Sequence, residues 1–189
     1  MRLTKALLVI ALLLPAAGCG DDSPAKENGG DARKSTAATS KYPSNVVHLD
    51  GMGAIRFGDN RTDLVGEKLV VTSGEKGCDG KPVYDVPGYV DAADLVFNAQ
   101  GKLGFVWVLS PGVYTPEKVT VDSPVAAVRK AYPQAEELAV SQRSFPGLLV
   151  KSERTAYLFL YEPTTGQVVK LLAGYTDILR QAQNEGITC

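Results

Sequence analysis

Histidine, cysteine and tryptophan are scarce in this chain of 189 residues, which has one His, three Cys and one Trp. His48 is the only histidine that a Ser-His-Asp or Cys-His site could use, and nothing around it resembles a nucleophile elbow. We therefore expect His48 to be a surface residue beside Asp50. Zinc-binding clusters of His and Cys and glycine-rich phosphate loops are also missing, so we expect no metal and no cofactor.

Charge of one sign is not in excess either. The chain has 20 basic and 21 acidic residues and a net charge of −1, which argues against binding to nucleic acid. With 44% hydrophobic and 22% charged residues, the composition excludes a disordered tail protein, a collagen-like fibre and a polytopic membrane protein.

One short apolar run, residues 6–14, follows Arg2 and Lys5. It is too short to cross a hydrocarbon core of ~30 Å, and it leads into small residues, so residues 1–18 are typical of an export signal. The sequence LPAAGC at 14–19 resembles the lipobox of bacterial lipoproteins. This resemblance implies that Cys19 carries a diacylglycerol and anchors the protein to the extracytoplasmic face of a bacterial cell membrane. The alternative is an ordinary secretory signal, with Cys19 incidental.

The number of cysteines bears on a disulfide. If Cys19 carries lipid, Cys78 and Cys189 remain as one pair, closing a loop of 111 residues (189 − 78 = 111). The chain-entropy model gives such a bond a stabilisation of up to about 4.7 kcal/mol. A bond from Cys19 to either of the other two is the rival pairing.

Residues 20–44 contain no Val, Ile, Leu or Phe. A segment of this composition cannot bury enough apolar surface to order itself, so residues 19–45 are predicted to be the lipidated Cys and a disordered tether. Its acidic and basic residues balance, so it is not a polybasic lipid-binding segment. Residues 46–189 are long enough for one folded domain.

Two segments of this domain resemble each other in sequence pattern. A helix is predicted near 59–65, and another 64 positions on, where Ser123 can cap it and Pro124 suits its first position. Each helix is followed by a predicted hairpin, 95–97 with 102–109 and 157–161 with 167–173, and earlier strands are expected at 83–86 and 138–145. The order predicts an α+β fold of two helix-plus-antiparallel-hairpin repeats, approximately 51–115 and 116–189, with the helices packed on one face of an antiparallel sheet. The alternative is a chance similarity between two generic hairpins.

Segments 51–64 and 121–128 look like a "G-hydrophobic-x-x-G-x-T-x-x-x-V" helix opening. That opening recurs in small actinobacterial envelope lipoproteins and, more distantly, in the β-lactamase-inhibitor-like and outer-membrane-assembly lipoprotein superfamily. The resemblance implies a cell-envelope accessory protein that binds another protein through its sheet and has no chemistry of its own.

Aromatic residues are the candidate binding surface. Strand alternation places Tyr157, Phe159 and Tyr161 on one face of their strand, and Phe105 with Trp107 on one face of the neighbouring strand. If the helices cover the aliphatic face, these five side chains form an open surface for an envelope protein, or for the stacked rings of a cell-wall glycan. If the helices cover the aromatic face instead, the same residues are core.

Carboxylate pairs are the only enzymatic possibility. Asp79, Asp85, Asp91 and Asp94 lie near one another in the sequence, and Glu136 is next to Glu137. A two-carboxylate hydrolase would need two such acids, for example Asp85 and Asp94, in one pocket with raised pKa values. No residue set meets the geometric tests for catalysis, and the spacing does not match a calcium loop, so we expect a protein that is not an enzyme.

Overall fold

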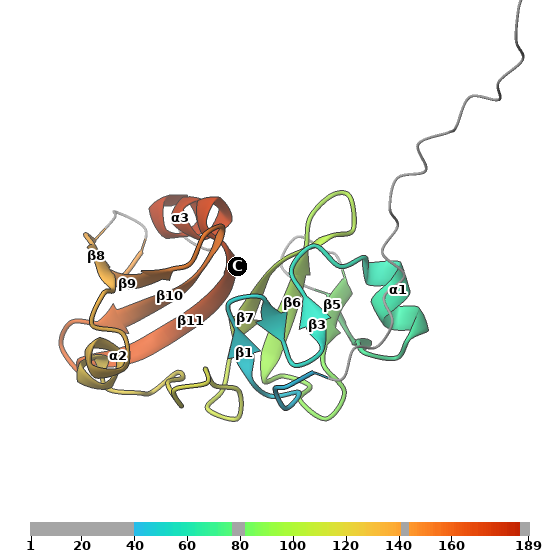
Figure 1. Ribbon diagram of the computed structural model, residues 1–189, viewed down its shortest axis with the longest axis horizontal. Coiled ribbons are helices and arrows are strands. Elements are labelled where there is room, and N and C mark those ends of the chain that lie inside the picture. The colour runs from blue at the N-terminus through green and yellow to red at the C-terminus, as the bar shows by residue number, and fades with distance from the viewer. Residues whose placement is uncertain (1–39, 77–81, 141–143, 186–189) are drawn as a thin grey trace, which may run out of the picture. The chain divides into compact units, whose positions relative to one another are not determined.

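The computed structural model describes residues 40–76, 82–140 and 144–185. The helices in this part of the chain are α1 (Arg61–Gly66), α2 (Val125–Ala131) and α3 (Thr176–Glu185) (Figure 1). The strands are β1 (Val47–His48), β2 (Gly51–Met52), β3 (Ile55–Arg56), β4 (Val71–Lys76), β5 (Pro82–Asp85), β6 (Ala93–Phe97), β7 (Leu103–Val108), β8 (Glu136–Leu138), β9 (Gly147–Lys151), β10 (Thr155–Glu162) and β11 (Gln167–Tyr175). No helix among the described residues is long and apolar enough to cross a membrane.

The signal segment and the three cysteines, Cys19, Cys78 and Cys189, lie outside the described residues. Among the described residues, those before the predicted boundary at residue 46 already contact the folded body. The Ser40 hydroxyl donates to the carbonyl of Gly53, and the Asn45 amide donates to the carbonyl of Gly112 at 3.0 Å. The last residues assigned to the tether are therefore held against the domain.

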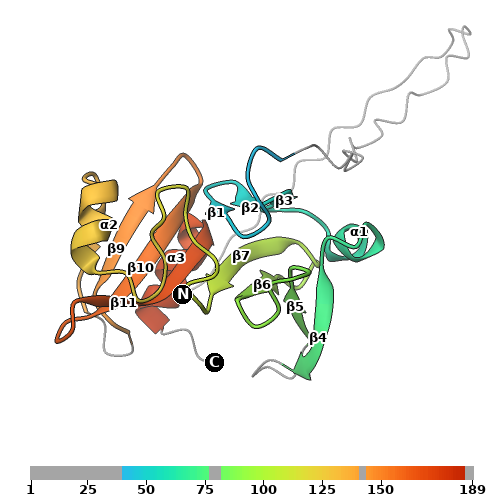
Figure 2. The same cartoon turned by 90° about the horizontal axis from the view of Figure 1, so that it is seen from below.

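Six strands form one antiparallel sheet in the order β6-β7-β11-β10-β9-β8, and Figure 2 shows most of them side by side. Directly paired residues share a face of a sheet, so the register defines a row of side chains across all six strands. From one edge to the other, this row consists of Asp94, Trp107, Leu172, Leu158, Leu149 and Glu136. Its centre is apolar, and both of its ends are acidic.

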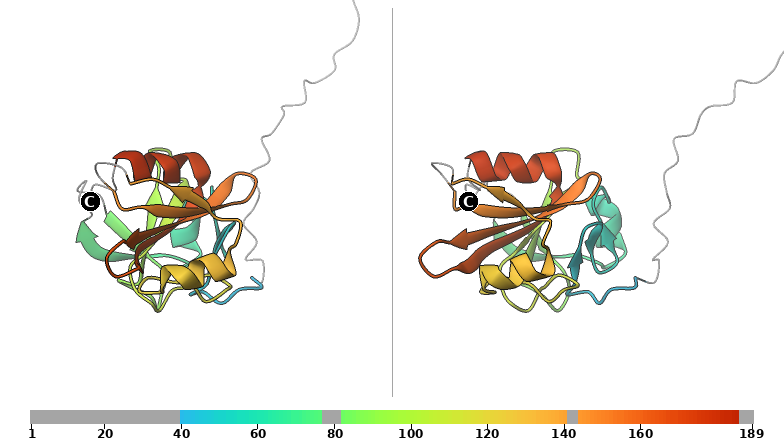
Figure 3. Two further views of the ribbon diagram at one scale, coloured as in Figure 1. Left: turned by 90° about the vertical axis from the view of Figure 1, so that its left-hand side faces the viewer. Right: turned by 60° about the vertical axis from the view of Figure 1, so that its left-hand side comes forward.

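Both faces of this sheet are covered. On β10, Tyr157 and Phe159 belong to the larger core cluster, together with Val128 of α2. Leu158 and Leu160 point the other way, into a smaller cluster that contains Leu179 of α3. Helices α2 and α3 therefore lie on opposite faces, as Figure 3 shows. The prediction that the helices pack on one face is wrong, because residues 176–185 form a third helix that covers the second apolar face.

Short strands β1, β2 and β3 form a separate antiparallel meander. Their apolar side chains join the larger core cluster, which includes Val47, Met52 and Ile55. The backbone of β3 packs closely against Gly51, since a Cβ at this position would lie 1.9 Å from the carbonyl oxygen of Ile55. The meander is thus a part of the core that also supplies surface turns.

Backbone hydrogen bonds join the start of α1 to the β6–β7 hairpin and the start of α2 to the β10–β11 hairpin. At α1 these are Gly58 N–H to Leu103 O (2.8 Å), Leu103 N–H to Asp59 O (2.9 Å) and Arg61 N–H to Gly101 O (2.8 Å). At α2 they are Asp122 N–H to Val168 O (2.8 Å), Val168 N–H to Ser123 O (2.9 Å) and Val125 N–H to Gly166 O (2.8 Å). The Ser123 hydroxyl does not cap α2, because it accepts the N–H of Thr120 at 3.0 Å instead.

The α+β class predicted from the sequence is confirmed. The predicted strands at 83–86, 95–97, 102–109, 157–161 and 167–173 correspond to β5, β6, β7, β10 and β11. Strand β8 ends at Leu138, where the predicted strand 138–145 begins, and β9 and α3 are additional elements.

Candidate functional site

The aromatic residues on β10 are mostly core. Tyr157 is 2% exposed and Phe159 is not exposed at all. Their rings lie 5.9 Å apart, and each lies 5.7 Å from the ring of Tyr132, which follows α2. Tyr161 is half-buried, with the Arg129 guanidinium 5.9 Å from its ring centre. The prediction of an open surface is therefore wrong for Tyr157 and Phe159, because α2 and the chain after it cover this face.

Phe105 and Trp107 lie on the other face of the sheet. Both are half-buried against the smaller cluster, since Trp107 pairs with Leu172 and not with a residue of the tyrosine row. The ammonium group of Lys170 lies 5.2 Å from the Trp107 ring centre, and Asp94 is the direct cross-strand neighbour of Trp107. The five aromatic residues therefore do not form one surface.

Asp85 and Asp94 are close enough to influence each other, since the charge of Asp85 raises the pKa of Asp94. Asp85 is fully buried, and neither carboxylate oxygen has a hydrogen-bond partner among the described residues. Burial raises the pKa of Asp85 and that of Asp94, and the charge of Asp91 raises both further. The backbone N–H of Asp91 lowers the pKa of Asp85 without meeting hydrogen-bond geometry. A wholly buried acid such as Asp85 cannot touch a substrate.

The other predicted acids are engaged in surface ion pairs or lie elsewhere. Glu136 contacts Lys151 at 2.7 Å and Arg180 at 2.7 Å, and these partners lower its pKa. Glu137 contacts Arg129 at 2.8 Å. Asp79 lies outside the described residues, and within residues 40–76, 82–140 and 144–185 no group of three metal-ligating side chains could hold a metal ion.

His48 is buried, with 3% of its surface exposed, so its assignment as a surface residue is wrong. Its ring stacks on Tyr42 with 4.6 Å between ring centres, because residues 40–42 fold back over the β1–β2 turn. Its Nδ1 accepts the N–H of Asp50 at 3.2 Å, and its Nε2 lies 3.1 Å from the carbonyl of Gly53. Burial is the main cause of a lowered pKa for His48.

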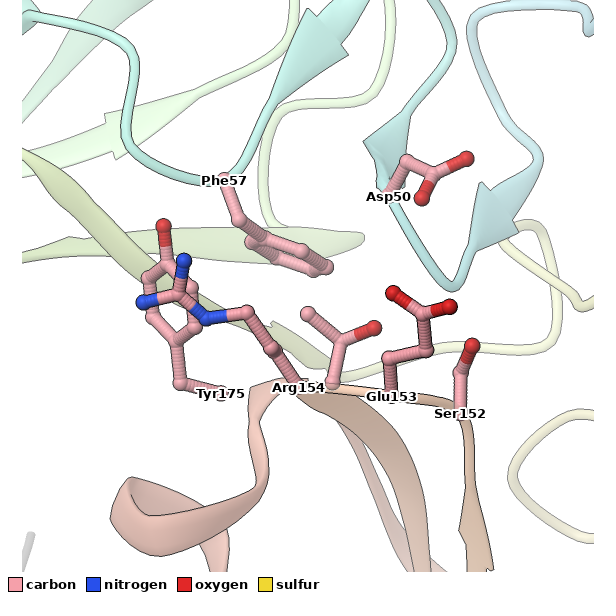
Figure 4. Close-up of a pocket in the computed structure, with 7 residues that line it drawn as sticks. Asp50, Phe57, Ser152, Glu153, Arg154 and Tyr175 are labelled. Carbon is pink, nitrogen blue, oxygen red and sulfur yellow. The ribbon is translucent and has the colours of Figure 1, made fainter.

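A hollow of about 230 Å³ lies where this turn meets the turn between β9 and β10 (Figure 4). Four separate stretches of the chain supply its lining, which consists of Asp50, Phe57, Ser152, Glu153, Arg154, Thr155 and Tyr175. The Phe57 ring projects between Arg154 with Tyr175 on one side and Asp50 with Glu153 on the other (Figure 4). The hollow thus has an aromatic centre, a basic side and an acidic side.

Backbone contacts position these groups. The N–H of Phe57 donates to the carbonyl of Asp50 at 2.9 Å, which joins the two residues across the meander. Thr155 pairs with Tyr175 on the sheet, and the N–H of Thr176 donates to the carbonyl of Arg154 at 3.0 Å. The lining residues are therefore carried by strand ends and hydrogen-bonded turns.

A second, more open depression of about 580 Å³ adjoins this hollow and shares Arg154 and Tyr175 with it. It follows the first turn of α3, where it is lined by Thr176, Asp177, Ile178 and Arg180. None of the ion pairs between described residues involves Arg154, Asp50 or Glu153. These charged groups are thus available to a ligand or partner.

The chain has weak similarity to two solved structures. No known protein family matches the chain, and no curated protein matches it. One solved structure is that of an extracellular protein containing a SCP domain from Bacillus anthracis str. Ames. It has 14% sequence identity and a TM-score of 0.46, and the alignment covers 74% of this chain and 49% of the Bacillus chain. The uncharacterized protein yfeY from Escherichia coli has 14% identity and a TM-score of 0.33, covering 69% of this chain and 97% of its own. The chain thus spans about half the length of the first of these structures.

Proposed function

We propose that this chain is a non-catalytic binding module of a bacterial cell envelope, and that it holds a protein partner at the hollow lined by Phe57, Arg154 and Tyr175. The observation that carries this proposal is the half-exposed aromatic pair beside an arginine without an ion-pair partner among the described residues. The two rings lie 6.1 Å apart. Aromatic residues and arginine are enriched among the residues that dominate binding at protein interfaces.

The size of the hollow favours a protein over a small molecule. Sites for drug-sized ligands usually have volumes of about 300–1,000 Å³, whereas this hollow has about 230 Å³ and is open to solvent. That volume suits one side chain of a partner, and the adjoining depression at α3 gives room for flanking residues. We place the binding site at this hollow and not on a face of the sheet, because both sheet faces carry core clusters.

The proposal assigns no catalysis to the chain. A hydrolase built on Asp85 and Asp94 loses its support, since Asp85 is fully buried. Activity assays on generic ester, peptide and glycoside substrates should give rates no higher than those of an Asp94→Asn variant.

The membrane anchor and the disulfide belong to the same proposal. Lipid on Cys19 would attach the module to the membrane, and a Cys78 to Cys189 bond would join the C-terminus to the loop between β4 and β5. Intact mass of membrane-extracted protein, measured before and after reduction, tests both. We expect a chain that starts at Cys19 with acyl groups and gains two hydrogen atoms on reduction. An unmodified, freely secreted chain would contradict the anchor.

We also infer that the domain consists of two copies of one helix-plus-hairpin unit. The support is the matched set of backbone hydrogen bonds at α1 and α2, whose members correspond at offsets of 64 and 65 residues. Two side-chain hydrogen bonds correspond at the same offset of 64 residues. Asp59 Oδ2 accepts the N–H of Arg56, and Ser123 Oγ accepts the N–H of Thr120. Gly101 and Gly166 both adopt positive φ values, 72° and 66°, in the corresponding turns. Generic hairpins share turn chemistry, but they do not require the same bonds to a preceding helix.

Photo-crosslinking tests the binding site without knowledge of the partner. A photoreactive phenylalanine analogue is placed at the exposed Ser152, which lines the hollow and is not one of the proposed binding groups, and, as a control, at the exposed Thr164 in the turn between β10 and β11. In native envelopes we expect a discrete protein adduct from position 152 and none from position 164. Equal adducts at both positions, or none at 152, would contradict the proposed site.

A glycan-binding function is the second candidate, and it is favoured by the position of Asp94 directly opposite Trp107 on one face. A carboxylate beside an indole could bind sugar hydroxyls while the ring stacks on a sugar. Sedimentation with purified cell walls tests this candidate. Retention that falls at least tenfold in Trp107→Ala, but not in Arg154→Ala, would support glycan binding over the hollow.

A further inference from the structure

The buried His48 is held in one protonation state by its neighbours. The N–H of Asp50 can only donate, so Nδ1 of His48, at 3.2 Å, must carry no proton. The proton therefore sits on Nε2, which donates to the carbonyl of Gly53 at 3.1 Å. The ring is neutral in this arrangement, and its two nitrogens tie the β1–β2 turn together.

The charges around His48 mostly oppose a second proton. The Arg56 guanidinium lies 3.3 Å from Nε2 and donates to the same Gly53 carbonyl at 2.8 Å. Burial lowers the pKa of His48 most strongly, and the charges of Arg56 and Lys41 lower it further. The Gly53 carbonyl and the carboxylate of Asp50 act in the opposite direction.

Among the described residues, the sheet side of this region places no charged group against His48. Tyr157 of β10 reaches toward the meander and donates its phenol to the carbonyl of Val47 at 3.4 Å, and burial raises the pKa of that phenol. Tyr42 stacks on the imidazole, with 4.6 Å between the ring centres. An imidazolium at position 48 would thus face two cations and one carboxylate inside the core.

Protonation at Nδ1 would replace an acceptor by a donor that faces the Asp50 N–H. Two donors at 3.2 Å repel, so either the ring or the turn must move. Asp50 lines the hollow, and its carbonyl accepts the N–H of Phe57, whose ring forms the centre of the hollow. Movement of the turn therefore reaches both groups on this side of the hollow.

We propose that protonation of His48 in mildly acidic conditions displaces the Asp50 turn and opens the hollow, so that the site binds its partner at neutral pH and releases it in acid. The release step rests on the proposed function of the hollow, whereas the displacement of the turn does not. His48 is the only histidine in the chain. Asp85 and Asp94 also have shifted pKa values, but neither lines the hollow.

Hydrogen exchange followed by mass spectrometry tests the displacement on the full mature chain. Peptides covering 40–58 are compared at pH 7.5 and 5.0, after correction for slower intrinsic exchange in acid, with peptides from β10 as the internal reference. We expect protection of 40–58 to fall about tenfold at pH 5.0 while β10 is unchanged. Protection that is equal at the two pH values would overturn the proposal.

The matched variant is His48→Asn. The Asn Oδ1 can accept the Asp50 N–H as in an Asx-turn, and the amide does not titrate. We expect its 40–58 segment to keep the same protection at both pH values. If the variant loses protection in acid as the wild type does, His48 is not the switch.

Titration of the single His48 ring signal by NMR provides a second measurement that does not need a folded His48 variant. We expect a midpoint below 6.5 in the wild type and a higher midpoint in Arg56→Gln, because one opposing cation is gone. A wild-type midpoint at or above 6.5 would overturn the proposal. If crosslinking at Ser152 fails while the exchange result holds, the binding site alone is refuted.

Discussion

Replacing Phe159 with alanine should destabilise the fold strongly, whereas the same change at Tyr161 on the same strand should not. Phe159 is fully buried, and its ring packs on Tyr132 and Tyr157. Truncation of a buried Phe costs about 3–5 kcal/mol of unfolding free energy. Each kcal/mol lowers Tm by about 2–4 °C in a protein of this size, so we expect a decrease of about 6–20 °C.

Tyr161 is half-buried, and its truncation should cost about 1 kcal/mol. Guanidinium unfolding of both variants can be followed by the fluorescence of Trp107, the only tryptophan, which packs on the opposite face of the sheet. Thermal unfolding by circular dichroism gives the Tm values. If Phe159→Ala unfolds within about 2 °C of the wild type, the aromatic row of β10 is not core, and the original binding-surface hypothesis would return.

Two further changes test other parts of the structure. Asp85→Asn should stabilise the protein at pH 7, because burial raises the pKa of Asp85 in the folded state and the amide carries no charge. The wild type therefore loses stability as pH rises through that pKa. The difference in unfolding free energy between variant and wild type should vanish near pH 3.8 and below. A difference that is constant with pH would contradict a buried charge. Gly174→Ala should lower Tm, since the added Cβ would lie 2.4 Å from the Cβ of Phe105. A Tm equal to that of the wild type would mean that β7 and β11 are not packed this closely.

Sequence periodicity determines which side chains of a strand share a face, and for β10 this part of the prediction is confirmed. Tyr157 and Phe159 lie together in one cluster, and Leu158 lies in the other. Periodicity does not determine which face is covered, and here both are. The missing information was α3, whose Leu179 covers the leucine face.

The relation between neighbouring strands could not be predicted from alternation. A shift of one residue in register moves every side chain of a strand to the other face. In the sheet, Trp107 pairs with Leu172 and thus shares a face with Leu158. Its expected grouping with Tyr157 would have required the other register.

The hollow had no signal in the sequence. Its lining comes from the β1–β2 turn, the chain after β3, the β9–β10 turn and the end of β11, which lie up to 125 residues apart (175 − 50 = 125). The burial of His48 was likewise hidden, because it depends on residues 40–42, which have the composition of a tether. Folding of Tyr42 onto the imidazole converts this junction into core.

The most direct test of the central claim is the crosslinking yield from position 152 measured in two backgrounds, Phe57→Ala and Val169→Ala. Phe57 forms the centre of the hollow, whereas Val169 is an exposed apolar residue on β11 and serves as the matched control. Both variants should retain the fold by circular dichroism. If the hollow holds the partner, the adduct at position 152 falls at least tenfold in Phe57→Ala and is unchanged in Val169→Ala. An adduct that survives Phe57→Ala at full yield would contradict the account.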